Sequence, residues 1–281
     1  MTSTDEGSET LLRNARWELL PFASFADQLA HVPPNATITL TASPEKGVET
    51  TVDMAVETAT NGSLTVVPHI AARAVRDREQ LSTMADRLHA AGITDIFVPG
   101  GDNEEPAGEF SSSLELLEAL EEMGISFDEI GITGYPEGHP KIDDGTLLEA
   151  LQSKEPYATY AVTQLCYDAD TIIEWIDETR EMGVELPLYI GIPGVMNYQK
   201  LAGISAKVGV GESIRFVRKT TGIFGMIKRM IGSRGVYKPD TLLDGLAPYA
   251  DEPHYDIAGL HLYTFNRASD TAAWRAGRLP E

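Results

Sequence analysis

A single (β/α)8 TIM barrel is the fold class that the sequence predicts, and three observations predict it. Short apolar runs rich in β-branched residues recur eight times along the chain. Most of them are separated by segments whose apolar residues lie three and four apart, which is the spacing of an amphipathic helix. The length of 281 residues is long for an ordinary domain but close to the roughly 250 residues typical of such a barrel.

Each of the eight runs is expected to form one strand. Alternating strands and helices imply parallel strands joined by helical crossovers, and eight such units favour a closed barrel. An open doubly wound sheet is the alternative, but no strand is followed by the G-x-G-x-x-G turn that marks nucleotide-binding members of that class. In chain order the runs are ARWELLPF (15–22), ATITLTAS (36–43), LTVVPHIA (64–71), DIFVPGGD (95–102), EIGITGYP (129–136), YAVTQLCY (160–167), PLYIGIPG (187–194) and IAGLHLYTFN (257–266).

The segments between the strands carry helix signals. DREQLSTMADRLHAAG (77–92) and SSSLELLEALEEMG (111–124) combine helical spacing with a terminal glycine, which is how an amphipathic helix ends. We expect residues 1–14, which are acidic and polar, to form a loose tail, and residues 207–250 to form an unusually long connection before the last strand. The whole chain, 1–281, is expected to be one catalytic domain.

The charge excludes some classes of partner. The chain has 43 acidic and 22 basic residues and a net charge of -21, and so negative a surface repels phosphate backbones and anionic lipid headgroups. The N-terminus lacks the features of a signal peptide, and no apolar run approaches the roughly 18 residues of a membrane span. Cys166 is the single cysteine and is expected to be a packing residue. We expect a soluble cytoplasmic protein that binds neither nucleic acid nor membranes.

Polar side chains follow the carboxyl ends of the expected strands, where barrel enzymes place their chemistry. Any one of them has a structural explanation, such as a satisfied core histidine or a helix cap, but together they favour a binding site. In chain order they are Glu18, Thr41, His69, Asp102, Tyr135, His139, Gln164, Asn197, Tyr263, Asn266 and Arg267.

Glu18 interrupts an apolar strand. A buried carboxylate is costly unless it is paired, protonated or used in chemistry. Because strand side chains alternate, Glu18 faces the barrel interior if Trp17 and Leu19 face the helices. An inward carboxyl near the barrel mouth suits a proton donor with a raised pKa.

Seven motifs together resemble one enzyme family. They are WELLPF, LTVVPHI, PGGD, GYPEGHP, VTQLCYD, IPGVMNY and HLYTFNRA, spread over roughly residues 15–275. In order and spacing they resemble the methylenetetrahydrofolate reductases, whose catalytic domain is a flavin-binding (β/α)8 barrel. The resemblance implies reduction of the folate 5,10-methylenetetrahydrofolate to 5-methyltetrahydrofolate, a step of one-carbon metabolism and methionine biosynthesis. It also implies FAD as the hydride donor and NADH or NADPH as the electron source.

The resemblance assigns roles to individual residues. It implies that Glu18 assists protonation at N10 of the folate, that Asp102 stabilises the iminium cation beside the flavin, and that Gln164 pairs with the pterin edge. A metal bound by His69, His139 and Glu137 is the rival idea, but no close ligand cluster supports it and no metal is expected. The implied cofactor-binding residues are Thr41, His69, Gly101, Asp102, Tyr135, His139 and Lys154, and the implied substrate-binding residues are Gln164, Tyr263 and Arg267.

The sequence departs from the family pattern in three ways. Gly100 replaces an arginine, and the basic pair that grips the flavin phosphates falls on Gln152 and Ser153, with only Lys154 nearby. The aromatic expected after the seventh strand aligns with Ile204. These departures leave open a flavin-free reductase in which a nicotinamide donates hydride directly, and a reductase that receives electrons from a partner protein. A barrel that binds methyltetrahydrofolate for methyl transfer also stays open.

The connection before the last strand is basic in an acidic protein. Its charges could pair with the acidic body, or could attract the anionic glutamate tail of a folate. Its apolar stretch IFGMIKRMIG is a candidate contact in a homo-oligomer. Between Lys207 and Lys238 the basic residues are Lys207, Arg215, Arg218, Lys219, Lys228, Arg229, Arg234 and Lys238, against the single acidic residue Glu212.

Overall fold

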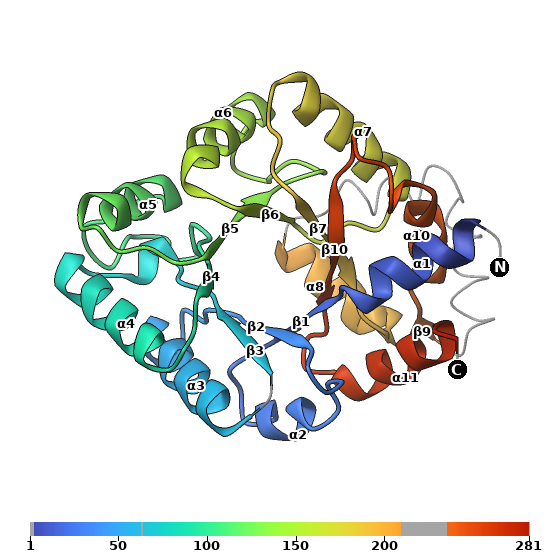
Figure 1. The fold of residues 1–281 in the computed structure, drawn as a ribbon, viewed down its shortest axis with the longest axis horizontal. Helices are drawn as coiled ribbons and strands as arrows, with labels where there is room; N and C mark the ends of the chain where they lie inside the picture. Colours follow the sequence, from blue (N-terminus) through green and yellow to red (C-terminus); the bar gives the residue numbers. More distant parts are fainter. Residues whose placement is uncertain (1–2, 63, 209–234, 281) are drawn as a thin grey trace.

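The computed structural model describes residues 3–62, 64–208 and 235–280, and it contains the expected barrel. Parallel strands form one sheet in the order β3-β2-β1-β10-β7-β6-β5-β4. A parallel bridge between His69 and Phe97 joins the two outer strands and closes the ring (Figure 1). All eight expected runs contribute a strand: β1 (Arg16–Leu19), β2 (Thr37–Leu40), β3 (Thr65–Pro68), β4 (Asp95–Phe97), β5 (Glu129–Gly134), β6 (Tyr160–Thr163), β7 (Leu188–Pro193) and β10 (Ile257–Tyr263).

Helices follow the strands and cover the outside of the barrel (Figure 1). Four of them begin at a residue whose side chain accepts a backbone N–H of the first turn, namely Asp77, Ser112, Asp143 and Asp168. Each such N-cap typically contributes about 1 kcal/mol. The outer helices are α2 (Phe25–Leu29), α3 (Val48–Asn61), α4 (Arg78–Ala90), α5 (Ser113–Glu122), α6 (Asp144–Lys154), α7 (Ala169–Glu181), α10 (Asp240–Leu246) and α11 (Ala268–Arg278).

The alternation along each strand separates two cores. Outward residues such as Trp17 and Leu19 are buried against the helices in the larger cluster. Inward residues form a smaller cluster inside the barrel, which includes Val67, Phe97 and Val162. Arg16 and Glu18 have the inward parity of β1, so the expectation that Glu18 faces the interior is consistent with this packing.

A buried ion pair fills the barrel at the start of the strands. The Arg16 guanidinium lies 3.0 Å from an Asp95 carboxylate oxygen and between the rings of Tyr160 and Tyr189, 4.2 and 3.9 Å from their centroids. The Tyr160 hydroxyl donates to Asp95 at 2.8 Å. Burial raises the pKa of Asp95 to about 6, although Arg16 and the Tyr160 hydrogen bond act against the rise.

The N-terminal segment is ordered, so the expectation of a loose tail is wrong for residues 3–13. They form α1 (Ser3–Arg13), which packs beside β10 and against α10 on the N-terminal side of the barrel (Figure 1). Leu11 and Leu12 are fully buried. Gly7 packs so closely that a Cβ atom there would lie 2.1 Å from the carbonyl oxygen of Ala247. The acidic residues of the segment suggested a solvated tail, but its apolar residues share one helix face, which is buried against the barrel.

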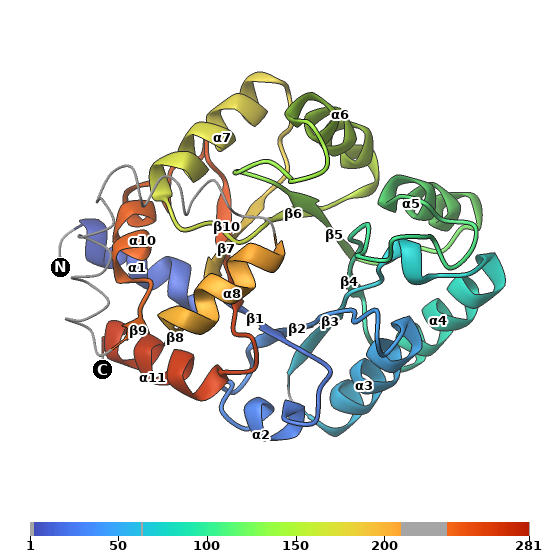
Figure 2. The ribbon, with the colours of Figure 1, turned by 180° about the vertical axis from the view of Figure 1, so that it is seen from behind.

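The long connection between β7 and β10 is present. Its described parts are the ribbon of β8 (Met196–Asn197) with β9 (Val236–Tyr237), α8 (Tyr198–Val208), and α10 with the short 3-10 helix that follows it. Helix α8 lies across the C-terminal end of the barrel, opposite α1 (Figure 2). The segment 209–234, which contains IFGMIKRMIG and six of the eight basic residues, lies outside the described residues. Among those that are described, no helix is long and apolar enough to cross a bilayer.

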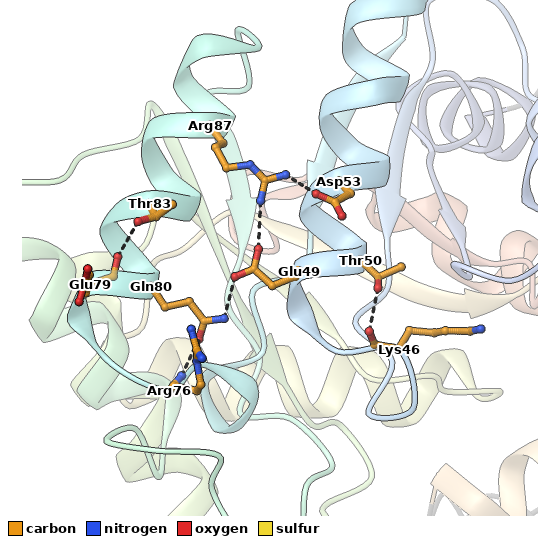
Figure 3. A network of polar contacts seen from close by, with 9 residues as sticks. All are labelled: Lys46, Glu49, Thr50, Asp53, Arg76, Glu79, Gln80, Thr83 and Arg87. Atoms are coloured by element: carbon orange, nitrogen blue, oxygen red, sulfur yellow. Dashed lines mark hydrogen bonds and ion pairs between the residues drawn. The ribbon is translucent and has the colours of Figure 1, made fainter.

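Helices α3 and α4 are joined by a partly exposed polar network (Figure 3). Arg87 on α4 bonds to Glu49 at 3.0 Å and to Asp53, both on α3. Gln80 donates to Glu49 at 2.7 Å and accepts the backbone N–H of Arg76 at 2.8 Å. This network holds two neighbouring helices in register on the side of the barrel.

Candidate active site

The candidate site lies at the C-terminal end of the barrel, and Glu18 is its most buried carboxylate. Glu18 pairs in register with Thr39 on β2 and with Tyr263 on β10. It is 5% exposed, although it belongs to a charged residue type that is seldom buried without a partner.

The partner of Glu18 is His261, which the sequence analysis did not select. His261 Nε2 lies 3.3 Å from Glu18 Oε2, and both side chains are almost fully buried. The His261 ring is also tilted against that of Tyr263, 4.7 Å between centroids. The signal was present in the sequence, because His261 precedes Tyr263 by two residues and therefore shares its inward parity on the strand.

His69 continues this row of groups across the barrel. Its ring lies 6.3 Å from that of His261 and 4.7 Å from that of Phe97. Burial, with a smaller contribution from His261, holds the pKa of His69 well below its usual value, so the imidazole is neutral at pH 7. Three buried polar atoms of this row make no hydrogen bond within the described part of the chain: His69 Nε2, His261 Nδ1 and Thr39 Oγ1. Buried atoms of this kind point to a bound water or ligand.

Gly101 and Asp102 lie on the loop after β4. Gly101 has φ 96°, and a Cβ atom there would lie 3.1 Å from that of Ala71, so a glycine suits this position. Asp102 is exposed. Its negative charge is felt by two residues after β5, since it contributes to the raised pKa of Tyr135 and opposes the lowered pKa of His139. The loops after β4 and β5 therefore meet at the mouth.

Tyr135 and His139 form an edge-to-face pair, with 5.5 Å between ring centroids. Burial is the main cause of the raised pKa of Tyr135, and a hydrogen bond with Thr133 acts against it. The pKa of His139 is lowered first by burial and then by the charge of Lys141. Both side chains are half-buried at the edge of the barrel mouth.

Gln164 and Tyr263 bring β6 and β10 to the same end. Gln164 continues the inward parity of Tyr160 and Val162, and its side-chain oxygen accepts the backbone N–H of Leu165 at 2.8 Å. The Tyr263 hydroxyl donates to the carbonyl of Thr163 at 3.0 Å. Burial first, and then the charge of Glu18, raise the pKa of Tyr263 well above its usual value.

The remaining expected residues differ in how well they are placed. Thr41 follows β2 at the mouth, and its hydroxyl bonds to the carbonyl of Leu19 at 3.4 Å. Arg267 is also at this end, but it forms an ion pair with Asp270. Asn197 caps the start of α8, where it accepts the N–H of Gln199 at 2.8 Å.

Lys154 is not brought to the site. It ends α6, directly before the segment that leads into β6, and it therefore lies at the opposite end of the barrel from the carboxyl ends of the strands. It is buried, and burial lowers its pKa to about 8. The expected grip of Lys154 on flavin phosphates does not fit this placement.

A cavity of about 450 Å³ lies outside the barrel ring, beside the end of β5 and between α6 and α7. Its lining includes Tyr135, Trp175 and the acidic residues Glu137, Asp144 and Glu178. The N-terminus of α6, which could otherwise bind an anion, is already capped by the Asp143 carboxylate. These walls disfavour a phosphate group. Across residues 3–62, 64–208 and 235–280, no group of three or more His, Cys, Asp or Glu side chains is arranged to hold a metal ion.

Comparison with known proteins gives a family match. A family model described as methylenetetrahydrofolate reductase matches residues 21–274. Asp102 and Gln164 lie inside the matched range, and Glu18 lies just before it. A methylenetetrahydrofolate reductase (NADH) 1 of Arabidopsis thaliana is 26% identical over 209 residues, covering 67% of this chain and 34% of that protein. A 5,10-methylenetetrahydrofolate reductase of Pectobacterium carotovorum is 26% identical over 194 residues, covering 68% and 62%.

Other comparisons add less. A probable methylenetetrahydrofolate reductase (NADPH) of Caenorhabditis elegans is 27% identical over 144 residues, covering 50% of this chain and 21% of that protein. The curated relatives therefore carry names of both NADH and NADPH types, and the chain spans only about a third of the length of the Arabidopsis relative. A GH18 chitinase of Cycas revoluta has a TM-score of 0.51 at 12% identity, covering 94% of this chain and 98% of that one, which is a likeness of fold alone.

Proposed function

The chain belongs to the methylenetetrahydrofolate reductase family, and from that premise we propose that it reduces 5,10-methylenetetrahydrofolate to 5-methyltetrahydrofolate. The observation that carries the proposal is the buried pair of Glu18 and His261 at the barrel mouth. Asp102 and Gln164 follow β4 and β6 at the same end of the barrel. This arrangement supports the proposal that a proton donor, a negative charge and an amide act together at this end of the barrel.

The proposed chemistry begins with a proton. Glu18 donates it to N10 of the folate, the bond between N10 and the methylene carbon breaks, and its electron pair stays on N10. The product is a cation in which the methylene carbon is doubly bonded to N5. Addition of a hydride to that carbon gives the N5-methyl group, and Glu18 recovers its proton from solvent.

The other residues act on the cation and on the pterin. Asp102 places a negative charge beside the developing positive charge, which lowers the energy of the iminium. Gln164 offers an amide that can accept from and donate to a pterin edge. His261 holds the Glu18 carboxyl in one orientation, because its Nε2 lies within hydrogen-bond reach. The ring of Tyr263, which lies beside His261 and Glu18, forms an aromatic side of the proposed site.

FAD is the redox group that the family resemblance implies, and its ring would fit at this mouth. Thr41, His69, Gly101, Tyr135 and His139 would hold it, and the unpartnered Nε2 of His69 is the observation that supports this. The chemistry that reduced FAD supplies when bound is a hydride for the methylene carbon. We propose these residues as contacts of the flavin ring and not of the FAD phosphates.

A second candidate is a flavin-free reductase in which NADH or NADPH donates hydride directly. The placement of Lys154 favours it, because the basic residue expected to grip the flavin phosphates lies at the far end of the barrel. The absorbance spectrum of the purified protein separates the two candidates. A flavin band supports FAD, whereas a colourless protein that oxidises NADH with methylenetetrahydrofolate supports the second. A flavin protein that works only with an added reductant indicates an electron-donating partner.

The proposed function is tested by Glu18→Gln, measured as methyltetrahydrofolate formed per enzyme. The amide has nearly the same shape but no acidic proton, so we expect kcat to fall by about 10² to 10⁴, the usual contribution of a general acid. The circular dichroism spectrum should be unchanged. Glu79→Gln, at an exposed position on α4, is the matched control. A Glu18→Gln enzyme with wild-type turnover would rule out the acid role.

A further inference from the structure

Two consecutive residues after β10 adopt the left-handed backbone conformation without being glycine. Phe265 has φ 48° and Asn266 has φ 55°. For a residue with a side chain this region is unfavourable, and asparagine tolerates it better than phenylalanine. Such a pair persists only where surrounding contacts hold it, and here those contacts come from the end of the strand that carries Glu18.

Asn266 binds the backbone beyond Glu18 from both sides. Its Oδ1 accepts the Leu20 N–H at 2.8 Å, and its Nδ2 donates to the Leu20 carbonyl at 3.1 Å and to the Ser24 hydroxyl at 3.1 Å. The register of β1 with β10 ends at Glu18 and Tyr263. The Asn266 amide therefore extends that pairing past the last backbone pair, in place of a further strand residue.

Neighbouring bonds fix the same junction. The Thr264 hydroxyl donates to the Glu18 carbonyl at 2.5 Å, and Gln28 accepts the N–H of Ala268 at 2.7 Å. Glu18 is thus held to the last strand by its own carbonyl and by its side chain, through His261. Asn266 adds bonds to the backbone of Leu20, two residues after Glu18.

We propose that Asn266 is a positioning residue that fixes the end of β1 and thereby aims the Glu18 carboxyl at the substrate. This role rests on the proposed reductase function. The left-handed pair has a second consequence, since it stacks the Phe265 ring on that of Tyr263, with 6.1 Å between centroids and 23° between planes. Loss of the amide leaves the end of β1 free to shift, and displacement of a reacting group by about 1 Å can lower turnover by about 10²-fold.

The test compares Asn266→Gly with the wild type. Glycine adopts φ near 55° without strain but has no side-chain amide. The variant therefore keeps the backbone turn and removes the hydrogen bonds to Leu20 and Ser24. At a temperature where circular dichroism shows both proteins folded, we expect kcat to fall at least about tenfold with KM changed by less than about twofold. Independently of activity, hydrogen exchange at the Leu20 amide should become faster, because its acceptor is gone.

Two controls exclude a general effect of stability or of a left-handed turn. Asp77→Ala removes the N-cap of α4, which follows β3 and takes no part in the bonds between the ends of β1 and β10, and should lower the melting temperature while kcat stays at the wild-type value. Asn35→Gly changes an exposed left-handed asparagine before β2 and should also leave kcat unchanged. Asn266→Asp keeps an acceptor for the Leu20 N–H but turns a carboxylate oxygen toward the Leu20 carbonyl, so it should not restore wild-type turnover.

Wild-type turnover in a folded Asn266→Gly enzyme, or unchanged exchange at Leu20, overturns the positioning role and leaves the proposed function standing. A wild-type protein that forms no methyltetrahydrofolate overturns the proposed function, and the positioning role with it.

Discussion

A buried histidine that cannot take up a proton makes the stability of the fold depend on pH. The pKa of His69 is held well below its usual value of about 6.5, mainly by burial and then by His261. In the unfolded chain the same imidazole takes up a proton as the pH falls through about 6.5, whereas in the folded protein it stays neutral. The folded state therefore loses stability as the pH falls below about 6.5, by up to about 1.4 kcal/mol per pH unit.

This expectation is measured by urea unfolding between pH 7.5 and 5.5 for the wild type and for His69→Gln. Glutamine does not titrate, so the free energy of unfolding of the variant should fall less over this range. Other titrating groups contribute to both proteins and cancel in the difference. Equal slopes for the two proteins would mean that His69 does not contribute.

Single residues show which part of the site the sequence could predict. Glu18 stood out because a carboxylate in an apolar strand needs a reason. His261 did not stand out, although parity on its strand places it inside the barrel, because its significance comes only from the 3.3 Å contact with Glu18. Lys154 was chosen by position after the fifth strand, but a helix eleven residues long carries it to the other end of the barrel. A spacing along the chain does not by itself give the end of a barrel at which a residue lies.

The secondary-structure elements were easier to predict than the contacts between them. Strands and outer helices follow from the period of the apolar residues and from terminal glycines, as the segments 77–92 and 111–124 illustrate. Helix α1 was missed because its acidic residues dominate the segment, while only a few apolar residues, among them Leu11 and Leu12, bind it to the barrel. Burial by a neighbouring element is a tertiary effect that a local pattern does not reveal.

Two arginines show how burial sets the strength of an ion pair between elements. Arg16 joins β1 to β4, and its side chain and that of Asp95 are each only 10% exposed. Arg87 joins α4 to α3, where the side chains of Arg87, Glu49 and Asp53 are 36%, 47% and 65% exposed. An uncompensated buried charge costs about 3–5 kcal/mol, whereas an exposed pair contributes about 0–1 kcal/mol.

We therefore expect Asp95→Ala to lower the free energy of unfolding by about 3–5 kcal/mol and Arg87→Ala by less than about 1 kcal/mol, both measured in urea. In the double variant Arg16→Met with Asp95→Leu no buried charge remains, so much of the loss should be recovered. An Asp95→Ala protein as stable as Arg87→Ala would contradict this account.

At the scale of the whole molecule the two ends of the barrel have different tasks. The end where the strands start is filled by the Arg16 cluster and has α1 packed at its edge, so it serves stability. The other end carries the Glu18 pair and the loops after β4 and β5, with α8 lying across it (Figure 2).

The net charge of -21 predicts how the entire fold responds to salt. Like charges on the surface repel one another and disfavour the compact state. From 0.1 to 1 M salt the Debye length falls from about 10 Å to about 3 Å, so this repulsion is screened. Exposed ion pairs such as Arg78 with Glu122 are weakened as well, but each is worth at most about 1 kcal/mol. Repulsion among so many excess acidic groups is the larger effect.

We expect the urea midpoint of unfolding to rise as KCl is increased from 0.1 to 1 M. Urea is the suitable denaturant because it is uncharged. A variant with the exposed residues Glu104, Glu105 and Glu121 changed to glutamine has less repulsion to screen, so its midpoint should rise less over the same range. A midpoint that falls with KCl would show that ion pairs outweigh repulsion. An equal rise in both proteins would trace the effect to salt acting on apolar surface rather than on charge.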